Sequence, residues 1–567
     1  MTIQECVVES IQRAVPELEA SVIGEMLEIP PDKKMGDYAF PCFRLAKQFR
    51  KAPALIAQDV AAHLKEEDLF EQVEVVGPYV NVFVNKEKIV ELVRDAFASQ
   101  EQFGSSQEGE GKTIVLDYSS INIAKPFHIG HLRTTAIGNA IHKLYRYLGY
   151  NTVRINYLGD WGTQFGKLAV AYRKWGNKEL VEKQGIQGLL DLYVRFHKEA
   201  KENPELDDEA RAAFTAMEHG DEEILSIWRW FVDISLKEVA KVYELLDVQF
   251  DSYKGESFYM DKVDAVIEEL KEKKLLQESD GAMIVDLSDA DMPPCLVLKK
   301  DGSSLYTTRD LAAAIYRKKT YDFYKCIYVT AFDQGLHFAQ FFKVLEKMGY
   351  EWSKDLVHVP YGLVSLESGK MSTREGQVVF LQDLLDEAIV KTKEIMQEKN
   401  PDLENLDEVA KQVGVGAVVF NDLFNNRIKD VTFSWNKVLN FDGETGPYVQ
   451  YTFARASSIL RKADYQTFRP EDMKGEYLTD AYAQDLLKII EEFPKKVHEA
   501  AERYEPYIIT RFTVALASSF NKFYHENPIL SAEQEELRNA RLAMTKMVTT
   551  VLKTGLSLIG VQAPEKM

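Results

Sequence analysis

The sequence predicts an α/β protein built around a doubly wound parallel sheet, with a smaller α+β domain before it and an all-helical domain after it. Two observations predict the sheet: an apolar strand, a helix and a second strand follow one another after residue 112, and the same order returns near residue 325. A third observation predicts the helical end, because strand patterns fade after about residue 400 and long amphipathic stretches replace them.

The composition is that of a soluble globular protein with several domains. The 567 residues are 46% hydrophobic and 28% charged, which is too long for one domain and enough for a sizeable core. No apolar run approaches the roughly 18 residues of a membrane helix, and the first residues lack an apolar signal core, so we expect a cytoplasmic protein without membrane contact. Widely spaced cysteines without a CxxC pair argue against a zinc site and favour a reducing compartment: Cys6, Cys42, Cys295 and Cys326.

The acidic balance argues against general nucleic-acid binding, although one window of the chain is basic. The formal net charge is −20, whereas contacts to phosphates need clustered Lys and Arg. Residues 111–170 nevertheless carry seven Lys or Arg and only two Asp. This window predicts a local anion partner, with a solvated basic face as the alternative.

Residues 1–108 are predicted to form the small α+β domain. The stretch PYVNVFVN alternates as a strand does, and helical patterns flank it. The run ASQEQFGSSQEGEGKT is polar, rich in Gly and Ser and without periodicity, which is typical of a linker.

Residues 109–395 are predicted to form the doubly wound domain, which is of the Rossmann type. The stretches TIVLDYS and TVRINYLGD have the character of strands, and between them apolar residues recur at helical spacing: Leu132, Ile137, Ile141, Leu144 and Leu148. The stretches KCIYVTAF, GLHFAQFFKVLEKMGY and LVHVPYGLVSL repeat the order of strand, helix and strand. Charged helical material at about 171–249 is the predicted insertion between the two halves. Residues 396–567 are predicted to form a helical bundle.

The stretch His128-Ile129-Gly130-His131 lies where the first strand gives way to a helix. Unpaired N–H groups and the helix dipole favour anions there, and glycine allows a base or a phosphate to approach the main chain. The imidazoles can donate hydrogen bonds to charge that develops on a phosphate. A plain helix start capped by two polar side chains remains an alternative. A metal site is less favoured, because no nearby Asp, Glu or Cys completes a ligand set.

A second polar stretch, ESGKMSTREG at residues 367–376, follows the last apolar strand. It contains two glycines and precedes a helical pattern. A loop that bears Lys370 and Arg374 can close over a polyphosphate, although basic loops are common and the stretch alone is a weak signal.

Together these two stretches are the paired signatures of class I aminoacyl-tRNA synthetases. The flanking residues narrow the resemblance: SSINIAKPFHIGHLRTTAIGNA, NYLGDWGTQFGKL, LYTTRDLAAA and NFDGETGPYVQYTFARASSI resemble arginyl-tRNA synthetases. The ending LKTGLSLIGVQAPEKM and the early MGDYAFPCFRLAK, which is similar to that family's own extra domain, extend the resemblance over nearly the whole chain.

The resemblance implies an ATP-dependent ligase that converts arginine and ATP to arginyl-adenylate and then transfers arginine to the terminal ribose of arginine tRNA. ATP would lie between the two signatures, with Mg²⁺ held mainly by phosphate oxygens rather than by a protein metal site. The residues implied at ATP are His128, Gly130, His131, Lys370, Met371 and Ser372.

The second signature departs from the general pattern in one residue. Class I enzymes usually carry Lys-Met-Ser-Lys-Ser, whereas this chain has Thr373 at the place of the second lysine. Arginyl enzymes often lack that lysine, and a lysine just before the first signature is thought to replace it. Lys125 precedes His128 by three residues and fits that role, so the implied catalytic residues are Lys125, His128, His131 and Lys370.

A guanidinium substrate needs planar carboxylate partners, because its donors form a fixed fork. The resemblance places these acids at Glu256 and Asp310, with Tyr306 packing on the substrate. Most of the 89 acids in the chain are expected to be solvated, so only the motif match singles out these two. The same match places the amino and carboxylate groups of arginine at Ser120, Asn122 and Gln334.

An acidic enzyme that binds tRNA is expected to use stacking and contacts to base edges more than bulk charge. In the first domain, Tyr79 and Asn81 lie on the same side of a predicted strand, and the family uses such a pair on a D-loop base. A structural tyrosine on a sheet is the alternative. The resemblance places anticodon contacts at Tyr448, Tyr451, Phe520, Tyr524 and Met567, although aromatic residues at helical spacing are more often core.

Three rival hypotheses remain open. A cysteinyl enzyme would need zinc ligands that the chain lacks, and a glutamyl enzyme would favour bases where Glu256 and Asp310 stand. A tRNA-binding paralogue without catalysis is the third, against which the intact signatures speak. We expect a monomer, and by analogy with the family we expect activation of arginine to require bound tRNA.

Overall fold

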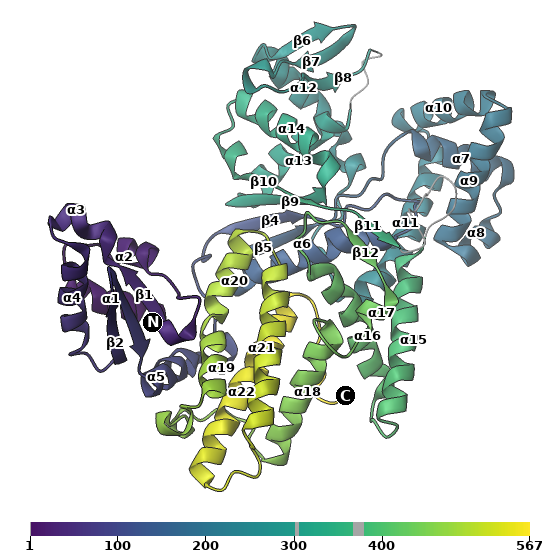
Figure 1. The fold of residues 1–567 in the computed structure, drawn as a ribbon. Coiled ribbons are helices and arrows are strands. Elements are labelled where there is room, and N and C mark those ends of the chain that lie inside the picture. The colour runs from purple at the N-terminus through teal and green to yellow at the C-terminus, as the bar shows by residue number, and fades with distance from the viewer. Residues whose placement is uncertain (1, 301–304, 367–378) are drawn as a thin grey trace.

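The central sheet of the molecule is parallel, as the sequence predicts. The structure is a computed structural model that describes residues 2–300, 305–366 and 379–567. The strand order is β10-β9-β4-β5, and each neighbouring pair is parallel. The chain starts in the middle and winds outward in both directions, so the predicted doubly wound class is confirmed (Figure 1). The elements are β4 (Thr113–Asp117), α6 (Ile129–Tyr147), β5 (Asn151–Ile155), α13 (Tyr306–Tyr321), β9 (Lys325–Ala331), α14 (Gly335–Lys347) and β10 (Leu356–Tyr361).

A small antiparallel sheet, with order β6-β7-β8, lies beyond α13 and α14 at the top of Figure 1. The periodicity does not predict it, because its strands are only four residues long and mostly half-buried or exposed. The elements are α12 (Val263–Glu272), β6 (Leu276–Ser279), β7 (Ala282–Val285) and β8 (Cys295–Leu298).

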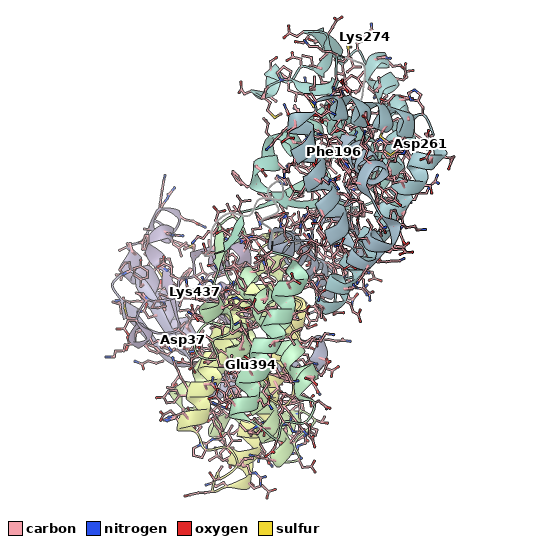
Figure 2. The ribbon with its side chains drawn as sticks, turned by 90° about the vertical axis from the view of Figure 1, so that its right-hand side faces the viewer. Asp37, Phe196, Asp261, Lys274, Glu394 and Lys437 are labelled. Atoms are coloured by element: carbon pink, nitrogen blue, oxygen red, sulfur yellow. The ribbon has the colours of Figure 1, made fainter. Side chains whose placement is uncertain are left out.

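The insertion between the two halves is helical, as expected, and its helices begin at Thr163, earlier than about residue 171. Phe196 is fully buried in its core, and the ammonium of Lys167 lies 5.5 Å from the centre of that ring (Figure 2). The helices are α7 (Thr163–Trp175), α8 (Lys178–Gln184), α9 (Ile186–Glu202), α10 (Glu205–Glu218) and α11 (Glu222–Leu245).

The first domain has helices around a three-stranded antiparallel sheet of order β1-β3-β2. Its first helix begins with a capping box, in which Thr2 and Glu5 each accept a main-chain N–H of the other. Lys488 of the last domain donates a hydrogen bond to Asp37, which ties the two domains together. Figure 2 labels Asp37. The elements are α1 (Ile3–Ala14), α2 (Ala20–Met26), β1 (Tyr38–Pro41), α3 (Ala46–Phe49), α4 (Pro53–Leu64), β2 (Phe70–Val76), β3 (Tyr79–Val84) and α5 (Lys86–Ala96).

The C-terminal part is a helical bundle, as predicted, with one short strand that the sequence patterns do not show. That strand, β12 (Val431–Phe433), pairs in parallel with β11 (Val364–Leu366) and joins the bundle to the central domain. The helices are α15 (Leu381–Lys399), α16 (Leu406–Leu423), α17 (Trp435–Val438), α18 (Gly446–Lys462), α19 (Ala481–Glu491), α20 (Phe493–Glu502), α21 (Tyr507–Glu526) and α22 (Glu535–Leu558).

Helix α6 is buried on nearly all sides, because it lies between the sheet and the helical bundle. It contacts β4, β5 and β9 on one side and α16, α20 and α22 on the other. Its approach to the end of β4 requires Gly138: a Cβ at that position would lie 2.2 Å from the ring of Tyr118. The middle of α6 is thereby packed closely against the residue that follows β4.

No helix in the described part of the chain combines the length and the apolar character that crossing a membrane requires.

Candidate functional site

The turn from β4 into α6 is built by its two histidines. Nδ1 of His128, the residue before the helix, accepts the main-chain N–H of Gly130 at 3.1 Å. The main-chain N–H of His128 donates in turn to Nδ1 of His131 at 3.2 Å, and the two ring centres lie 4.1 Å apart. Because both Nδ1 atoms accept, the proton of each neutral ring is assigned to Nε2. The two histidines therefore cap the helix, as the alternative interpretation predicts, and each ring still has one N–H donor for a ligand.

Both imidazoles are uncharged at neutral pH. Burial lowers the pKa of His131 to about 3, with the neighbouring His128 and Lys125 as smaller contributors to that shift. Burial also lowers the pKa of His128, with Lys125 as a second cause. The start of α6 thus offers two neutral donors beside the positive charge of Lys125.

Glycine at position 130 is required by the ring of His128. A Cβ there would lie 2.8 Å from Cε1 of His128, closer than atoms of a real side chain come. Any larger residue would push the ring out of its capping position.

The chain that follows the second signature is anchored at the first. Phe380 forms an isolated antiparallel bridge with His128, and the N–H of Leu381 donates to the carbonyl of Phe127 at 2.8 Å. The predicted residues Lys370, Met371 and Ser372, together with Thr373 and Arg374, lie outside the described residues. Phe380, which follows that segment closely, therefore lies beside the first signature.

The carboxyl end of β4 carries the residues predicted to hold the amino and carboxylate groups of arginine. Ser120 has a positive φ of 42° and donates its hydroxyl to Asp117 at 2.7 Å. Asn122 is exposed and bridges Gly159 in parallel fashion. Gln334 is exposed after the neighbouring strand β9, so these residues share the edge of the sheet where ligands bind doubly wound folds.

Asp310 of α13 is held by a histidine that the sequence analysis missed. Nε2 of His337, from α14, lies 2.7 Å from Oδ2 of Asp310 and donates to it. The ring of Tyr306 packs edge-on against His337, with centres 4.8 Å apart, and Tyr306 remains 52% exposed. The predicted aromatic residue and the predicted acid are therefore joined through His337, which lies three residues after Gln334 in GLHF.

Glu256 begins a short 3₁₀ helix (Glu256–Lys262), which comes after the helical insertion in the chain. The pKa of Glu256 is raised to about 7: burial is the largest cause, Asp310 and Asp160 contribute to the rise, and the nearby Arg309 limits it. The two predicted acids are thus brought into one electrostatic environment. Nη2 of Arg309, a residue that the sequence analysis also missed, lies 3.7 Å from Oε1 of Glu256.

The predicted D-loop pair lies on one face of β3. Tyr79 is half-buried and packs edge-on against Phe43 at 5.6 Å between ring centres. Asn81 is only 2% exposed, less than expected for a residue that presents its amide to RNA. The face opposite to them carries the core residues Val80 and Val82.

Three of the predicted anticodon contacts surround one cavity of about 500 Å³, namely Tyr451, Tyr524 and Met567. The guanidinium of Arg455 lies 4.9 Å from the centre of the Tyr451 ring at the same cavity. Phe520 is fully buried and stacks behind Tyr524, with ring centres 6.3 Å apart, so it supports the cavity wall instead of lining it.

Tyr448 lies elsewhere: it lines a neighbouring cavity, and its hydroxyl accepts from Asn521 at 3.0 Å. The aromatic spacing alone does not separate these positions, because one turn of α18 carries Tyr448 and Tyr451 to different surfaces.

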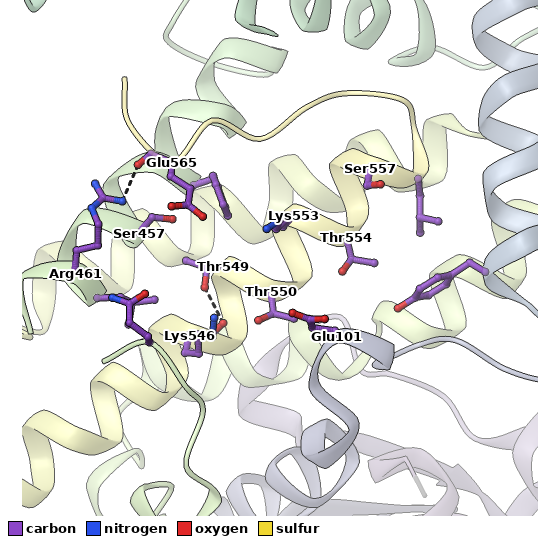
Figure 3. A pocket seen from close by; sticks show the side chains of 15 residues that line it. Glu101, Ser457, Arg461, Lys546, Thr549, Thr550, Lys553, Thr554, Ser557 and Glu565 are labelled. Atoms are coloured by element: carbon purple, nitrogen blue, oxygen red, sulfur yellow. Dashed lines mark hydrogen bonds between the residues drawn. The ribbon is translucent and has the colours of Figure 1, made fainter. Parts of the chain in front are cut away.

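A further cavity of about 400 Å³ lies between α18, α22 and residues 97–102 (Figure 3). Lys546 and Lys553, two turns apart on α22, line it together with several hydroxyls. Within the described residues neither lysine has an ion-pair partner. The lining also includes Arg461 and the acids Glu101 and Glu565, so its charge is mixed, and none of the predicted site residues lines it.

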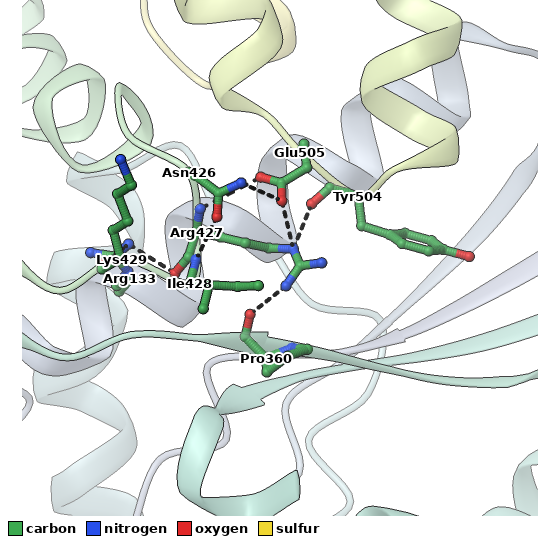
Figure 4. Close-up of polar contacts among 8 residues, drawn as sticks. All are labelled: Arg133, Pro360, Asn426, Arg427, Ile428, Lys429, Tyr504 and Glu505. Atoms are coloured by element: carbon green, nitrogen blue, oxygen red, sulfur yellow. Dashed lines mark hydrogen bonds and ion pairs between the residues drawn. The ribbon is translucent and has the colours of Figure 1, made fainter.

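Helix α6 is fixed to the helical bundle by a buried ion pair. Nη1 of Arg133 lies 3.8 Å from Oδ1 of Asp422 on α16, and both side chains are almost completely buried. Nη2 of Arg133 donates to the carbonyls of Arg427 and Lys429 at 3.0 and 2.8 Å (Figure 4). Burial raises the pKa of Asp422 to about 6, and Arg133 offsets only part of that rise.

The loop that accepts these bonds also reaches the sheet. Arg427 donates to the carbonyl of Pro360, in β10, at 2.6 Å and to that of Tyr504 at 3.1 Å. Its Nε lies 3.6 Å from Oε1 of Glu505, between α20 and α21 (Figure 4). Sheet, α6 and bundle therefore meet at one polar junction.

Within residues 2–300, 305–366 and 379–567, no group of three or more His, Cys, Asp or Glu side chains is placed to hold a metal ion.

Three protein-family models match nearly the whole chain. The model described as "tRNA synthetases class I (R), catalytic domain" matches residues 92–435. That described as "DALR anticodon binding domain" matches residues 449–567, and "Arginyl tRNA synthetase N terminal domain" matches residues 1–84.

Individual proteins match over the same length. The arginine--tRNA ligase of Alkaliphilus metalliredigens is 55% identical over 544 residues, which is 96% of each chain. That of Clostridioides difficile is 55% identical over 568 residues, which is 100% of this chain and 99% of the other. The solved structure of Thermus thermophilus arginyl-tRNA synthetase has a TM-score of 0.83, covers 100% of both chains and is 27% identical.

Proposed function

The chain belongs to the arginyl-tRNA synthetase family, and from that premise we propose how its own residues carry out the reaction. Its activity is that of an arginine--tRNA ligase, an ATP-dependent enzyme whose substrates are L-arginine, ATP and tRNA. The assignment of the site depends on one observation: two neutral imidazole donors and a pair of half-buried acids lie around the carboxyl ends of the same parallel strands.

In the first step the carboxylate of arginine attacks the α-phosphorus of ATP, and pyrophosphate leaves. His128 and His131 donate to the triphosphate as charge develops on its oxygens, and Gly130 permits close approach of the nucleotide. Lys125 supplies positive charge at the same place, which is supported by its effect on both imidazoles. Lys370, Met371 and Ser372, which lie outside the described residues, are proposed as further contacts of ATP.

The guanidinium of arginine binds between Glu256 and Asp310, because its fork of donors suits two carboxylates better than a single ammonium does. Tyr306 covers the substrate from its exposed position beside His337. Ser120, Asn122 and Gln334 hold the amino and carboxylate groups at the edge of the sheet.

Mg²⁺ enters as the complex with ATP. The side chains at the start of α6 are nitrogen donors, whereas Mg²⁺ prefers oxygen ligands, so the phosphates supply most of its coordination. We expect a monomer, to be checked by light scattering. The four cysteines are all free and buried, which is consistent with work in the reducing cytoplasm, where ATP and tRNA are found.

In the second step a hydroxyl of the terminal ribose of tRNA attacks the carbonyl carbon of arginyl-adenylate, and AMP leaves. Tyr79 contacts the D-loop, and Asn81, which is only 2% exposed in this structure, lies on the same face of β3. The cavity of Tyr451, Tyr524 and Met567 takes an anticodon base by stacking. Phe520 backs that cavity, and Tyr448 contacts the loop from the neighbouring surface.

Binding of tRNA precedes activation of arginine in this proposal. The test is arginine-dependent exchange between ATP and labelled pyrophosphate, with and without cognate tRNA. Exchange only in the presence of tRNA is the expected result. Brisk exchange without tRNA would contradict the order of binding, and absence of exchange under both conditions would contradict the proposed activity.

A further inference from the structure

Arg309 places a guanidinium beside an acid to which the substrate guanidinium is assigned. The distance of 3.7 Å between its Nη2 and Oε1 of Glu256 is close enough for attraction between the charges. It is longer than a hydrogen bond, so Arg309 does not use an acceptor position of the carboxylate. The side chains are only 14% and 19% exposed, which limits screening by solvent.

The charges around Glu256 come from three parts of the fold. Arg309 and Asp310 lie on α13, and Asp160 follows β5, where its carboxylate accepts both the N–H and the hydroxyl of Ser257. His337, on α14, is bonded to Asp310. Arg309 is thus the opposing cation in a cluster of three acids, and its Nε is buried without a hydrogen-bond partner among the described residues.

A carboxylate and a carboxylic acid behave differently toward arginine. The ionised form accepts two parallel N–H bonds from a guanidinium, whereas the protonated form gives up an acceptor position and presents an O–H that opposes the donors. Burial and two neighbouring acids favour the protonated form of Glu256. A nearby cation that lowers the pKa of Glu256 therefore increases the fraction of enzyme that can bind the substrate guanidinium.

We propose that Arg309 is a positioning residue for arginine binding: it favours the carboxylate form of Glu256 without occupying the acceptor positions that the substrate guanidinium needs. The inference rests on the proposed function, because it takes Glu256 as a contact of the substrate. It adds a residue that acts on the substrate through Glu256.

The test is the pH dependence of the KM for arginine in tRNA-supported pyrophosphate exchange. In the unchanged enzyme KM falls as the pH rises through about 7, where Glu256 ionises, and then levels off. In Arg309→Met the same fall moves to higher pH by about one unit, so KM at pH 7 rises by about fivefold and most of that rise is gone by about pH 8.5. Arg309→Lys keeps the charge and restores most of the normal profile.

Two controls separate this role from a loss of structure. Lys319→Met removes an exposed charge from the same helix and is expected to leave the profile unchanged. In a Glu256→Gln background, adding Arg309→Met changes KM by less than about twofold, since no titrating group remains to be held.

A KM increase in Arg309→Met that is the same at pH 7 and pH 8.5 would overturn the inference and would instead place Arg309 on the substrate itself. Full additivity with Glu256→Gln would overturn it as well. If Glu256→Gln alone left the KM for arginine unchanged, the proposed contact between Glu256 and arginine would be wrong. That outcome is distinct from failure of the inference about Arg309. Arg309→Gln serves as the uncharged variant if Arg309→Met melts well below the unchanged enzyme.

Discussion

The main-chain N–H of His128 donates to Nδ1 of His131 at 3.2 Å, so one imidazole closes the first turn of α6 while its other nitrogen stays available as a donor. The ring of His128 does the same with the N–H of Gly130. In the proposed mechanism, capping and catalysis thus use opposite sides of each ring. The two roles can be separated by choosing which nitrogen a substitution imitates.

Substituting His131 by Asn or Gln tests this division. Asn places an acceptor near the position of Nδ1 and keeps the cap, whereas Gln places a donor near that of Nε2. We expect His131→Asn to melt close to the unchanged enzyme but to lose about 10²-fold in the kcat of pyrophosphate exchange. His131→Gln should melt earlier and retain more activity at low temperature. The reverse order would show that the ring acts through the cap alone.

Lys125 is predicted to contribute more to activation than Lys370. Its charge acts directly on both histidines, and Thr373 stands where the usual second lysine of the other signature would be. Lys125→Ala should therefore reduce the kcat of pyrophosphate exchange more strongly than Lys370→Ala. Equal losses, or a larger loss in Lys370→Ala, would refute this assignment.

Asp310 and its partner His337 are predicted to determine arginine binding. Asp310→Asn removes charge-assisted hydrogen bonds worth about 1.5–3 kcal/mol, so the KM for arginine should rise roughly 10- to 100-fold. His337→Ala should raise it less, and His337→Gln, which keeps a donor near Nε2, less still. An unchanged KM in Asp310→Asn would mean that the guanidinium binds elsewhere.

The buried pair of Arg133 and Asp422 is predicted to make stability depend on pH. The pKa of Asp422 is about 6 in the folded protein, above its ordinary value of 3.8, because burial outweighs the attraction of Arg133. Its contribution to stability is therefore complete below about pH 4 and is lost as the pH rises through 6. Asp422→Asn does not titrate, so its free energy of unfolding lacks this pH-dependent loss. The difference in free energy of unfolding between Asp422→Asn and the unchanged protein should therefore shift by about 1 kcal/mol in favour of the variant from pH 5 to pH 7.

Urea unfolding of both proteins at the two pH values measures this difference. If the unchanged protein instead became more stable relative to Asp422→Asn from pH 5 to pH 7, Arg133 would outweigh burial and the pKa of Asp422 in the folded protein would be lowered.

Local patterns were enough to predict the central sheet and α6, because each of their elements carries its own periodicity and the His-x-Gly-His turn has a fixed place between them. The sheet of β6, β7 and β8 was not predicted, since four-residue strands without alternation carry no such signal. The partners of the acids were missed for a different reason: Arg309 and Glu256, like His337 and Asp310, meet only through tertiary packing. Spacing in sequence does not contain that information.

The sequence patterns also did not predict how much of each side chain is exposed to solvent. Phe520 and Tyr524 follow one another by one helical turn, yet the first is fully buried and the second lines a cavity. Asn81 alternates correctly with the core residues of β3 but is covered by its surroundings. A pattern gives the face of an element, and only packing decides how much of that face reaches solvent.

The central claim is that this enzyme attaches arginine, and only arginine, to its tRNA. The direct test is aminoacylation of total tRNA by the purified enzyme with each of the standard labelled amino acids in turn. We predict ATP-dependent charging with arginine and none above background with lysine, glutamate or cysteine. Charging with another amino acid in preference to arginine, or none with any of them, would contradict the account.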